Sequence, residues 1–304
     1  MKKKHILITA SIALCIIASI FIFINRNISY TNTNRTSHDT YVSYGFLDAD
    51  GNILSNGSQL DLQSNKNIEA IHHTLDLDQF IEEDREYLLI AFVDFKQVTF
   101  KVDGKSYSSY KFNTSKRDHV QFDLQLDLPG NSKELDYILI RKPYYMPKEK
   151  NVDSLLPLQT IFPIRFKIAD FDSKIKYEKS VKIFTEGPYD NVYISDNENQ
   201  FDLLYEVNEN NNIFLTLGND SDENIDYAVI LLNNWNQVSF NDGDLIKFFD
   251  VKSQEKQSIE IKVPEVDENS YFQAIAFPMP YQVNVNNMMS TNAFGSSKCI
   301  IKNN

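Results

Sequence analysis

The sequence predicts an all-β protein in which two tandem immunoglobulin-like β-sandwich domains follow one N-terminal transmembrane helix. Three observations lead to this prediction. A long apolar run lies near the N-terminus. Short segments rich in Val, Ile, Phe and Tyr fill the rest of the chain. Several of these segments recur later, in the same order.

Residues 6–24, ILITASIALCIIASIFIFI, contain no charged side chain. A helix of that length spans roughly 28 Å at about 1.5 Å per residue, close to the thickness of the bilayer core. Lys2, Lys3 and Lys4 precede the run, so the positive-inside rule predicts a cytoplasmic N-terminus and an extracellular remainder. We therefore expect residues 1–25 to form a signal-anchor, with membrane contact through residues 6–24.

Two alternatives to an uncleaved anchor concern processing. A cleaved signal peptide usually has a shorter apolar region that ends at small residues, whereas this run ends in Phe21-Ile22-Phe23-Ile24. A lipid-modified Cys15 would need a small residue before it, where Leu14 stands. Both patterns favour the anchor.

The stretch 26–40 is polar, with few large apolar residues, and is predicted to be a flexible stalk. All 42 acidic residues and 26 of the 30 basic residues follow Arg26, which gives this part a net charge of −16. Phosphate binding needs a high density of Lys and Arg, so we do not expect a nucleic acid as a partner. The two cysteines, Cys15 and Cys299, allow no disulfide within the extracellular part, which favours a bacterial cell-surface protein.

Beyond the stalk the chain matches itself in four segments, at offsets of 135–140 residues. The pairs are 87–100 with 227–240, 120–126 with 259–263, 137–143 with 272–278, and 164–168 with 299–302. We interpret them as two copies of one domain, over 41–172 and 173–304, with two unrelated β domains as the alternative. Each copy would hold about seven strands, separated by turns such as 48–52 and 241–243. Trp235 would be the core tryptophan of the second copy, at the place of Phe95 in the first.

The histidines, cysteines and acidic residues form no recognisable catalytic motif. We therefore expect no catalytic residue, metal ligand or cofactor. His72 and His73 are adjacent in a predicted strand and so point to opposite faces. Cys299 is expected to be a buried thiol. The acidic turns 48–52 and 219–224 resemble parts of calcium loops, but Gln59 stands where the first such loop needs a bidentate Glu. A hairpin turn also explains the first of them.

Two long connections before the last strand of each copy are the candidate binding loops. They run through 143–160 and 278–290 and carry Pro, Tyr and Met, which suit adaptable contacts. The candidate binding residues are Tyr144, Tyr145, Met146, Met279 and Tyr281. The alternative is that these loops fold back and cap the sandwich ends.

The predicted function is that of a membrane-anchored extracellular protein for binding, adhesion or envelope scaffolding. We expect no catalytic activity and a protein partner on the extracellular side. The alternative is an envelope hydrolase, or an accessory subunit of an envelope enzyme, with its site in the first domain near His72, His73 and His119.

Overall fold

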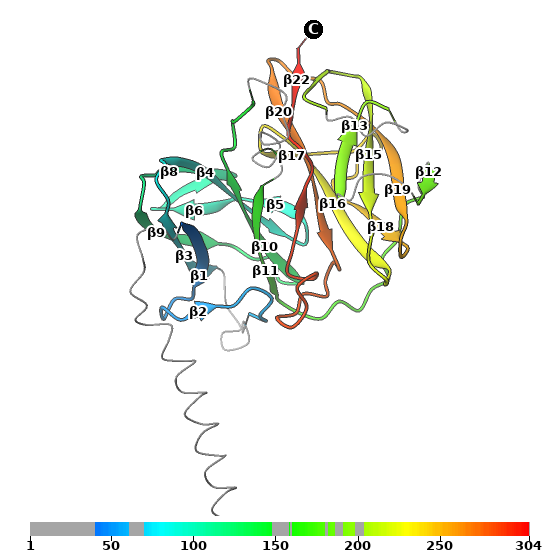
Figure 1. The fold of residues 1–304 in the computed structure, drawn as a ribbon. Coiled ribbons are helices and arrows are strands. Elements are labelled where there is room, and N and C mark those ends of the chain that lie inside the picture. The colour runs from blue at the N-terminus through cyan, green and yellow to red at the C-terminus, as the bar shows by residue number, and fades with distance from the viewer. Residues whose placement is uncertain are drawn as a thin grey trace, which may run out of the picture. The chain divides into compact units, whose positions relative to one another are not determined.

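Strands build the part of the chain that the computed structural model describes, residues 40–60, 70–147, 158, 160–179, 182–185, 191–197 and 204–303 (Figure 1). The all-β prediction is therefore confirmed. Within these ranges no helix is long and apolar enough to cross a membrane. The predicted anchor at 6–24 and nearly all of the predicted stalk lie outside the described residues.

Strands β1 to β11, here called the first half, form two sheets. The outer sheet has the order β2-β1-β3-β9-β6-β7, with β2 (Ile53–Leu54), β1 (Tyr41–Leu47), β3 (Ile71–Phe80), β9 (Asp118–Leu126), β6 (Phe100–Val102) and β7 (Lys105–Tyr107). The inner sheet has the order β11-β10-β4-β5, with β8 also paired to β4: β11 (Ile161–Lys167), β10 (Glu134–Arg141), β4 (Arg85–Val93), β5 (Lys96–Val98) and β8 (Ser109–Thr114).

Strands β12 to β22, the second half, also form two sheets. The outer sheet has the order β12-β19-β15-β13, with β12 (Lys182–Phe184), β19 (Lys256–Lys262), β15 (Asn212–Gly218) and β13 (Val192–Ser195). The inner sheet has the order β14-β22-β20-β16-β17, with β18 beside β16 and β21 beside β20: β14 (Glu206–Asn208), β22 (Cys299–Lys302), β20 (Ser270–Pro278), β16 (Ile225–Asn233), β17 (Asn236–Val238), β18 (Lys247–Val251) and β21 (Phe294–Gly295).

Each half has an apolar core between its two sheets, as a sandwich-like fold requires. In the first half, Leu75 and Leu77 of the outer sheet meet Leu89 and Tyr137 of the inner sheet. In the second half, Leu215 and Ile261 of the outer sheet share a core with residues of β16 and β20.

A third core joins the two halves, and we call this interface the seam. It lies between the inner sheets and contains Leu88, Ile90, Phe92, Phe95, Ile138 and Ile140 from the first half, with Ala228, Ile230, Leu232, Trp235, Ile275, Phe277 and Ala293 from the second. Alternate residues of β4 and β16 therefore face either their own sandwich or the other half. Residues 42–304 accordingly form one compact unit.

Burial on both faces explains why the inner strands are so apolar. A sheet with one wet face alternates apolar and polar side chains, whereas one covered on both faces has continuous apolar runs. Segments 87–93 and 227–232 are such runs, and the structure buries all of their side chains. β9, in the outer sheet of the first half, instead alternates between exposed and less exposed positions over most of its length.

Several segments that match in sequence take equivalent positions. β4 and β16 each begin a two-residue hairpin into β5 and β17, and each pairs on its other side with β10 or β20. The division into domains at residue 172 stays a prediction. Trp235 is a correction: it fills the seam together with Phe95, and not the core of the second sandwich.

Candidate functional site

The seam joins the two halves, and both candidate binding loops touch it. Two groups of polar contacts cross it: the first lies between paired hairpins, and the second is made by buried charged side chains.

In the first group, the hairpins β4–β5 and β16–β17 place equivalent glutamines opposite each other. The backbone N–H of Gln97 donates to Oε1 of Gln237 at 2.7 Å, and the N–H of Gln237 donates to Oε1 of Gln97 at 2.5 Å. Each side-chain amide also donates across the seam, from Gln97 to the carbonyl of Trp235 and from Gln237 to the carbonyl of Phe95, both at 2.9 Å. The contact is close to two-fold symmetric.

The turns of these hairpins take an unusual backbone conformation. Asp94 and Phe95 have φ values of 50° and 62°, and Asn234 and Trp235 have 44° and 66°. Two positive φ values suit the tight turns that join twisted strands, but Gly is the usual residue there because bulky side chains are strained. Here the second position of each turn holds an aromatic ring, Phe95 or Trp235, and both rings are buried in the seam. Packing at the seam offsets the strain.

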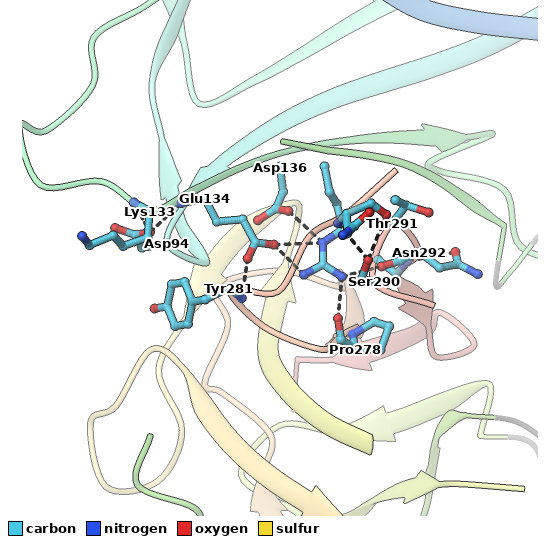
Figure 2. Close-up of polar contacts among 12 residues, drawn as sticks. Asp94, Lys133, Glu134, Asp136, Pro278, Tyr281, Ser290, Thr291 and Asn292 are labelled. Atoms are coloured by element: carbon cyan, nitrogen blue, oxygen red, sulfur yellow. Dashed lines mark hydrogen bonds and ion pairs between the residues drawn. The ribbon is translucent and has the colours of Figure 1, made fainter. Parts of the chain in front are cut away.

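In the second group, a fully buried arginine joins the halves. Arg165 on β11 lies opposite Asp136 on β10 in register. Its Nε donates to Oε1 of Glu134 at 2.9 Å and to Oδ1 of Asp136 at 3.1 Å, and its Nη2 donates to Oε1 of Glu134 at 2.5 Å. All three side chains have 0% exposure. Figure 2 shows Glu134 and Asp136 converging from β10 on the point where Pro278 and Asn292 approach.

The same guanidinium reaches the second half. Its Nη1 donates to the backbone carbonyls of Pro278 at 2.7 Å and Asn292 at 2.9 Å. The second oxygen of Glu134 accepts the backbone N–H of Tyr281 at 2.6 Å. Both ends of segment 278–292 are thus held on the first half by charged groups, and such hydrogen bonds are stronger than neutral ones.

One of the two carboxyl groups in the cluster has a perturbed pKa. Burial, and next the negative charge of Glu134, raise the pKa of Asp136 well above its ordinary value of 3.8, although Arg165 opposes this shift. The raised pKa favours the protonated form of Asp136, which lowers the negative charge that is buried beside Arg165. A net charge is costly to bury, so this shift makes the buried cluster less costly.

The predicted binding residues of the second loop lie beside this charged cluster. Tyr281 is partly buried: its ring stacks on Phe171 at 4.1 Å and meets Phe95 edge-on at 5.1 Å. Burial raises its pKa. Met279 is also partly buried, and its sulfur accepts a hydrogen bond from the side chain of Asn287 at 3.3 Å.

The predicted binding residues of the first loop include one, Tyr144, that contacts the second half. Tyr144 is 41% exposed, yet its ring meets Tyr271 at 5.4 Å and Trp235 at 6.3 Å, and its carbonyl accepts the hydroxyl of Tyr271 at 2.8 Å. Tyr145 and Met146 are partly exposed. The loop continues into residues 148–157, outside the described part of the chain. A binding role for the five residues stays a prediction.

Lys298 of the second half binds the backbone at the start of the first loop. Its buried Nζ donates to the carbonyls of Lys142 at 2.7 Å and Pro143 at 3.3 Å and lies 5.7 Å from the centre of the Trp235 ring. Burial, with a smaller contribution from Arg141, lowers the pKa of Lys298 to about 7. Lys298 and Tyr271 of the second half therefore both bind the backbone of the first loop.

The histidines of the first half do not form one site. His119 pairs with Asp76 at 2.5 Å on an exposed face, and the hydrogen bond to Asp76 raises its pKa. His73 is buried beside the hydroxyl of Tyr137, 3.2 Å away, and burial lowers its pKa to about 4. His72 on β3 pairs with Gln125 on β9, and Gln125 lies six positions from His119 along that strand, a distance of about 20 Å.

His72 and His73 border a depression of about 330 Å³ together with Asp48, Thr74 and Asp123. The carboxylates that border this depression already accept hydrogen bonds from other groups of the chain. Oδ1 of Asp48 accepts the backbone N–H groups of Asp50 and Asn52, and Oδ1 of Asp123 accepts the hydroxyl of Thr74. In the second acidic turn, Asn219 binds backbone groups in the same way. Among the described residues, no group of three or more His, Cys, Asp and Glu could hold a metal ion.

Sequence reasoning missed the residues that join the halves: Gln97, Glu134, Asp136, Arg165 and Gln237. One signal was available, because Gln recurs within the strongest internal match, at 97 and 237. A polar residue repeated between apolar strands indicates a specific hydrogen bond. For Arg165 no local pattern distinguishes a buried arginine from an exposed one.

Comparisons with known proteins add no identity. No family model matches the chain, and no curated protein matches it. Similar solved structures include red sea bream transglutaminase (7% identity, TM-score 0.22, 88% of this chain and 32% of that chain), the E. coli chaperone DraB (9%, 0.24, 87% and 97%) and CBD12 from CALX1.2 (11%, 0.20, 69% and 73%). The chain thus spans about a third of the transglutaminase. At these TM-scores the likenesses support no argument about function.

Proposed function

We propose that the chain is a membrane-anchored, non-enzymatic surface protein whose two immunoglobulin-like sandwiches act as one rigid binding body. Residues 6–24 would hold it in the membrane with a cytoplasmic N-terminus, and the body would stand on the extracellular side. The observation that carries the proposal is the seam. Because it is apolar, buried and crossed by two groups of hydrogen bonds, it supports a single preformed surface rather than two modules that move independently.

The partner we propose is a protein that contacts the first loop around Tyr144, Tyr145 and Met146. Tyr144 is partly exposed and held by its contacts with Tyr271 and Trp235. Rigid aromatic side chains lose little conformational entropy on binding and often dominate binding energy. The acidity of the body would favour a partner with a basic surface.

The runner-up is an envelope hydrolase that uses the first half. The depression beside His72 supports it, but His119 lies about 20 Å away along the sheet and so could not act with His72 on one substrate. If this alternative is correct, the purified protein should have hydrolase activity that His72→Ala abolishes, whereas the binding proposal expects no activity in either protein.

Topology can be tested with protease on intact cells. We expect loss of the body and survival of an N-terminal tag, whereas mature protein in the medium that begins after residue 25 would contradict the anchor.

Binding can be tested by comparing capture by the wild type with capture by a Tyr144→Ser, Tyr145→Ser double variant. The matched control is Tyr177→Ser, which removes a tyrosine that is exposed to a similar degree, 38% against 41%, but lies outside the loop. We expect the double variant to lose partners that the control retains. If both variants lose the same partners in proportion to their melting temperatures, the loop acts only through stability and the proposed surface is wrong.

A further inference from the structure

The loop that joins β20 to β22, residues 279–297, contains no Asp, Glu, Lys or Arg, although such residues make up 24% of the chain. We call it the uncharged loop. The neighbouring segment 52–60 of the first half is also free of charge. This corner of the body therefore has a solvent-facing stretch without charge.

The tip of the uncharged loop presents apolar side chains to solvent. Met288 is 88% exposed and Val285 is 53% exposed, and both are among the most exposed large apolar residues in the described part of the chain. Neither exposure contributes to folding stability, because hydrophobic side chains stabilise a fold only when they leave water.

The backbone of this tip is nevertheless firmly held. Oδ1 of Asn287 accepts the N–H groups of Met289 at 3.0 Å and Ser290 at 3.2 Å. The buried hydroxyl of Ser290 accepts the N–H of Asn284 at 3.0 Å and donates to the carbonyl of Asn287 at 2.9 Å. These bonds fix the loop in a shape that keeps Val285 and Met288 outside.

Residues of the first half bind and pack against the tip. Asn56 donates to the carbonyl of Thr291 at 3.1 Å. Gly57 has φ +89°, and a Cβ there would lie 2.5 Å from Cγ2 of Thr291 and 2.7 Å from the backbone N of Val285. Only glycine permits so close an approach. The exposed tip is thus a preformed feature that both halves build.

The tip lies close to the point where the chain enters the body. The ring of Tyr44 on β1 is 5.1 Å from that of Phe162, at the start of β11. The next residue, Pro163, offers its carbonyl to Asn56 at 3.5 Å, and Asn56 binds the uncharged loop. A short chain of contacts therefore connects the first strand with the tip.

We propose that Val285 and Met288 dock on the surface of a lipid bilayer and hold the body against the membrane that anchors it. The inference rests on the proposed anchor at residues 6–24. As an unstructured chain, the stalk at 26–40 would span about 20 Å, which keeps the start of β1, and with it the tip, near the bilayer. Tethering at this range makes even a weak contact effective.

Charge favours the bilayer over other occupants. The part of the chain beyond Arg26 carries a net charge of −16, so most of its surface would be repelled by acidic lipid. The uncharged loop is free of this repulsion, and its exposed apolar side chains could enter the headgroup region. A second copy of the chain is the competing occupant, and it is an outcome of the test.

The experiment uses the full chain with Cys15→Ser, reconstituted in vesicles of phosphatidylcholine and phosphatidylglycerol. A polarity-sensitive fluorophore is attached to Met288→Cys, or in the control to Ile183→Cys on β12, which is also apolar and 58% exposed. Cys299 is buried and should not react under native conditions. Lipids with a quencher near the headgroup report contact with the bilayer, and resistance to alkaline carbonate extraction reports the anchor separately.

We expect a blue shift and lipid quenching for the probe at 288, neither at 183, and loss of both when Val285→Asp is added without a change in melting temperature. Equal signals at 288 and 183 in protein that resists extraction would overturn the lipid proposal and leave the anchor intact. Disulfide cross-linking between two copies of Met288→Cys, without quenching, would assign the tip to self-association instead. Release by carbonate would refute the anchor on which the inference rests.

Discussion

Replacing Arg165 with Met tests whether the buried charged cluster holds the two halves together. Met fills a comparable volume but carries no charge. The change removes the donors to Glu134 and Asp136 and to the carbonyls of Pro278 and Asn292. Glu134 would remain fully buried and would keep the hydrogen bond from the N–H of Tyr281.

The expected loss of stability is large. Removing one partner of a buried ion pair costs about 3–5 kcal/mol, because the other charge stays buried without compensation. For a body of this size, 1 kcal/mol shifts the melting temperature by about 2–4 °C. We therefore expect Arg165→Met to lower the melting temperature by roughly 6–20 °C.

The control is Arg117→Met, which breaks an exposed ion pair with Glu82 and should change the melting temperature little. Adding Glu134→Gln and Asp136→Leu to Arg165→Met removes the orphaned charge and should recover much of the loss. Gln is chosen because it can still accept the N–H of Tyr281. Hydrogen exchange should show the greatest loss of protection in residues 279–293.

A melting temperature for Arg165→Met within about 2 °C of the wild type would refute this reasoning. It would mean that solvent reaches the cluster and that the seam does not depend on it. A loss that the triple variant fails to recover would instead assign the cost to the shape of the side chain and not to its charge.

Three further predictions concern the same seam. The raised pKa of Asp136 means that the folded state keeps a proton that the unfolded state loses above about pH 4, so the free energy of unfolding falls as the pH rises toward the folded pKa. Asp136→Asn should flatten this fall when the free energy of unfolding is measured by urea denaturation from pH 4 upward. Identical pH profiles for the variant and the wild type would contradict the raised pKa. Gln97→Ala and Gln237→Ala should show a coupling of about 1 kcal/mol in a double-mutant cycle, whereas simple additivity would mean that their bonds form independently. Fragments 40–172 and 173–304 should bind each other when mixed, because each alone exposes its side of the seam. Elution of the mixture at the size of a single fragment in size-exclusion chromatography would count against a shared core.

The fold class follows from the residues alone. Strand segments such as 87–93, 120–126 and 272–278 are recognisable because β-branched and aromatic residues cluster there between turn residues, and this local preference does not depend on the rest of the chain. The internal match between 87–100 and 227–240 likewise indicates that two hairpins are equivalent, and β4–β5 and β16–β17 have this equivalence. The candidate binding loops lie between β10 and β11 and between β20 and β22, as their positions before the last strands predict.

Tertiary contacts were needed to establish what the inner sheets face and which loop residues remain free. A continuous apolar run indicates that both faces of a strand are buried, but it does not identify the second partner, and here that partner is the other half of the same chain. Tyr281 and Met288 are both large side chains of one loop, yet Tyr281 packs on Phe95 and Phe171 while Met288 points to solvent. The difference arises because burial depends on contacts between residues far apart in sequence, such as Arg165 with Pro278, and local composition carries no record of them.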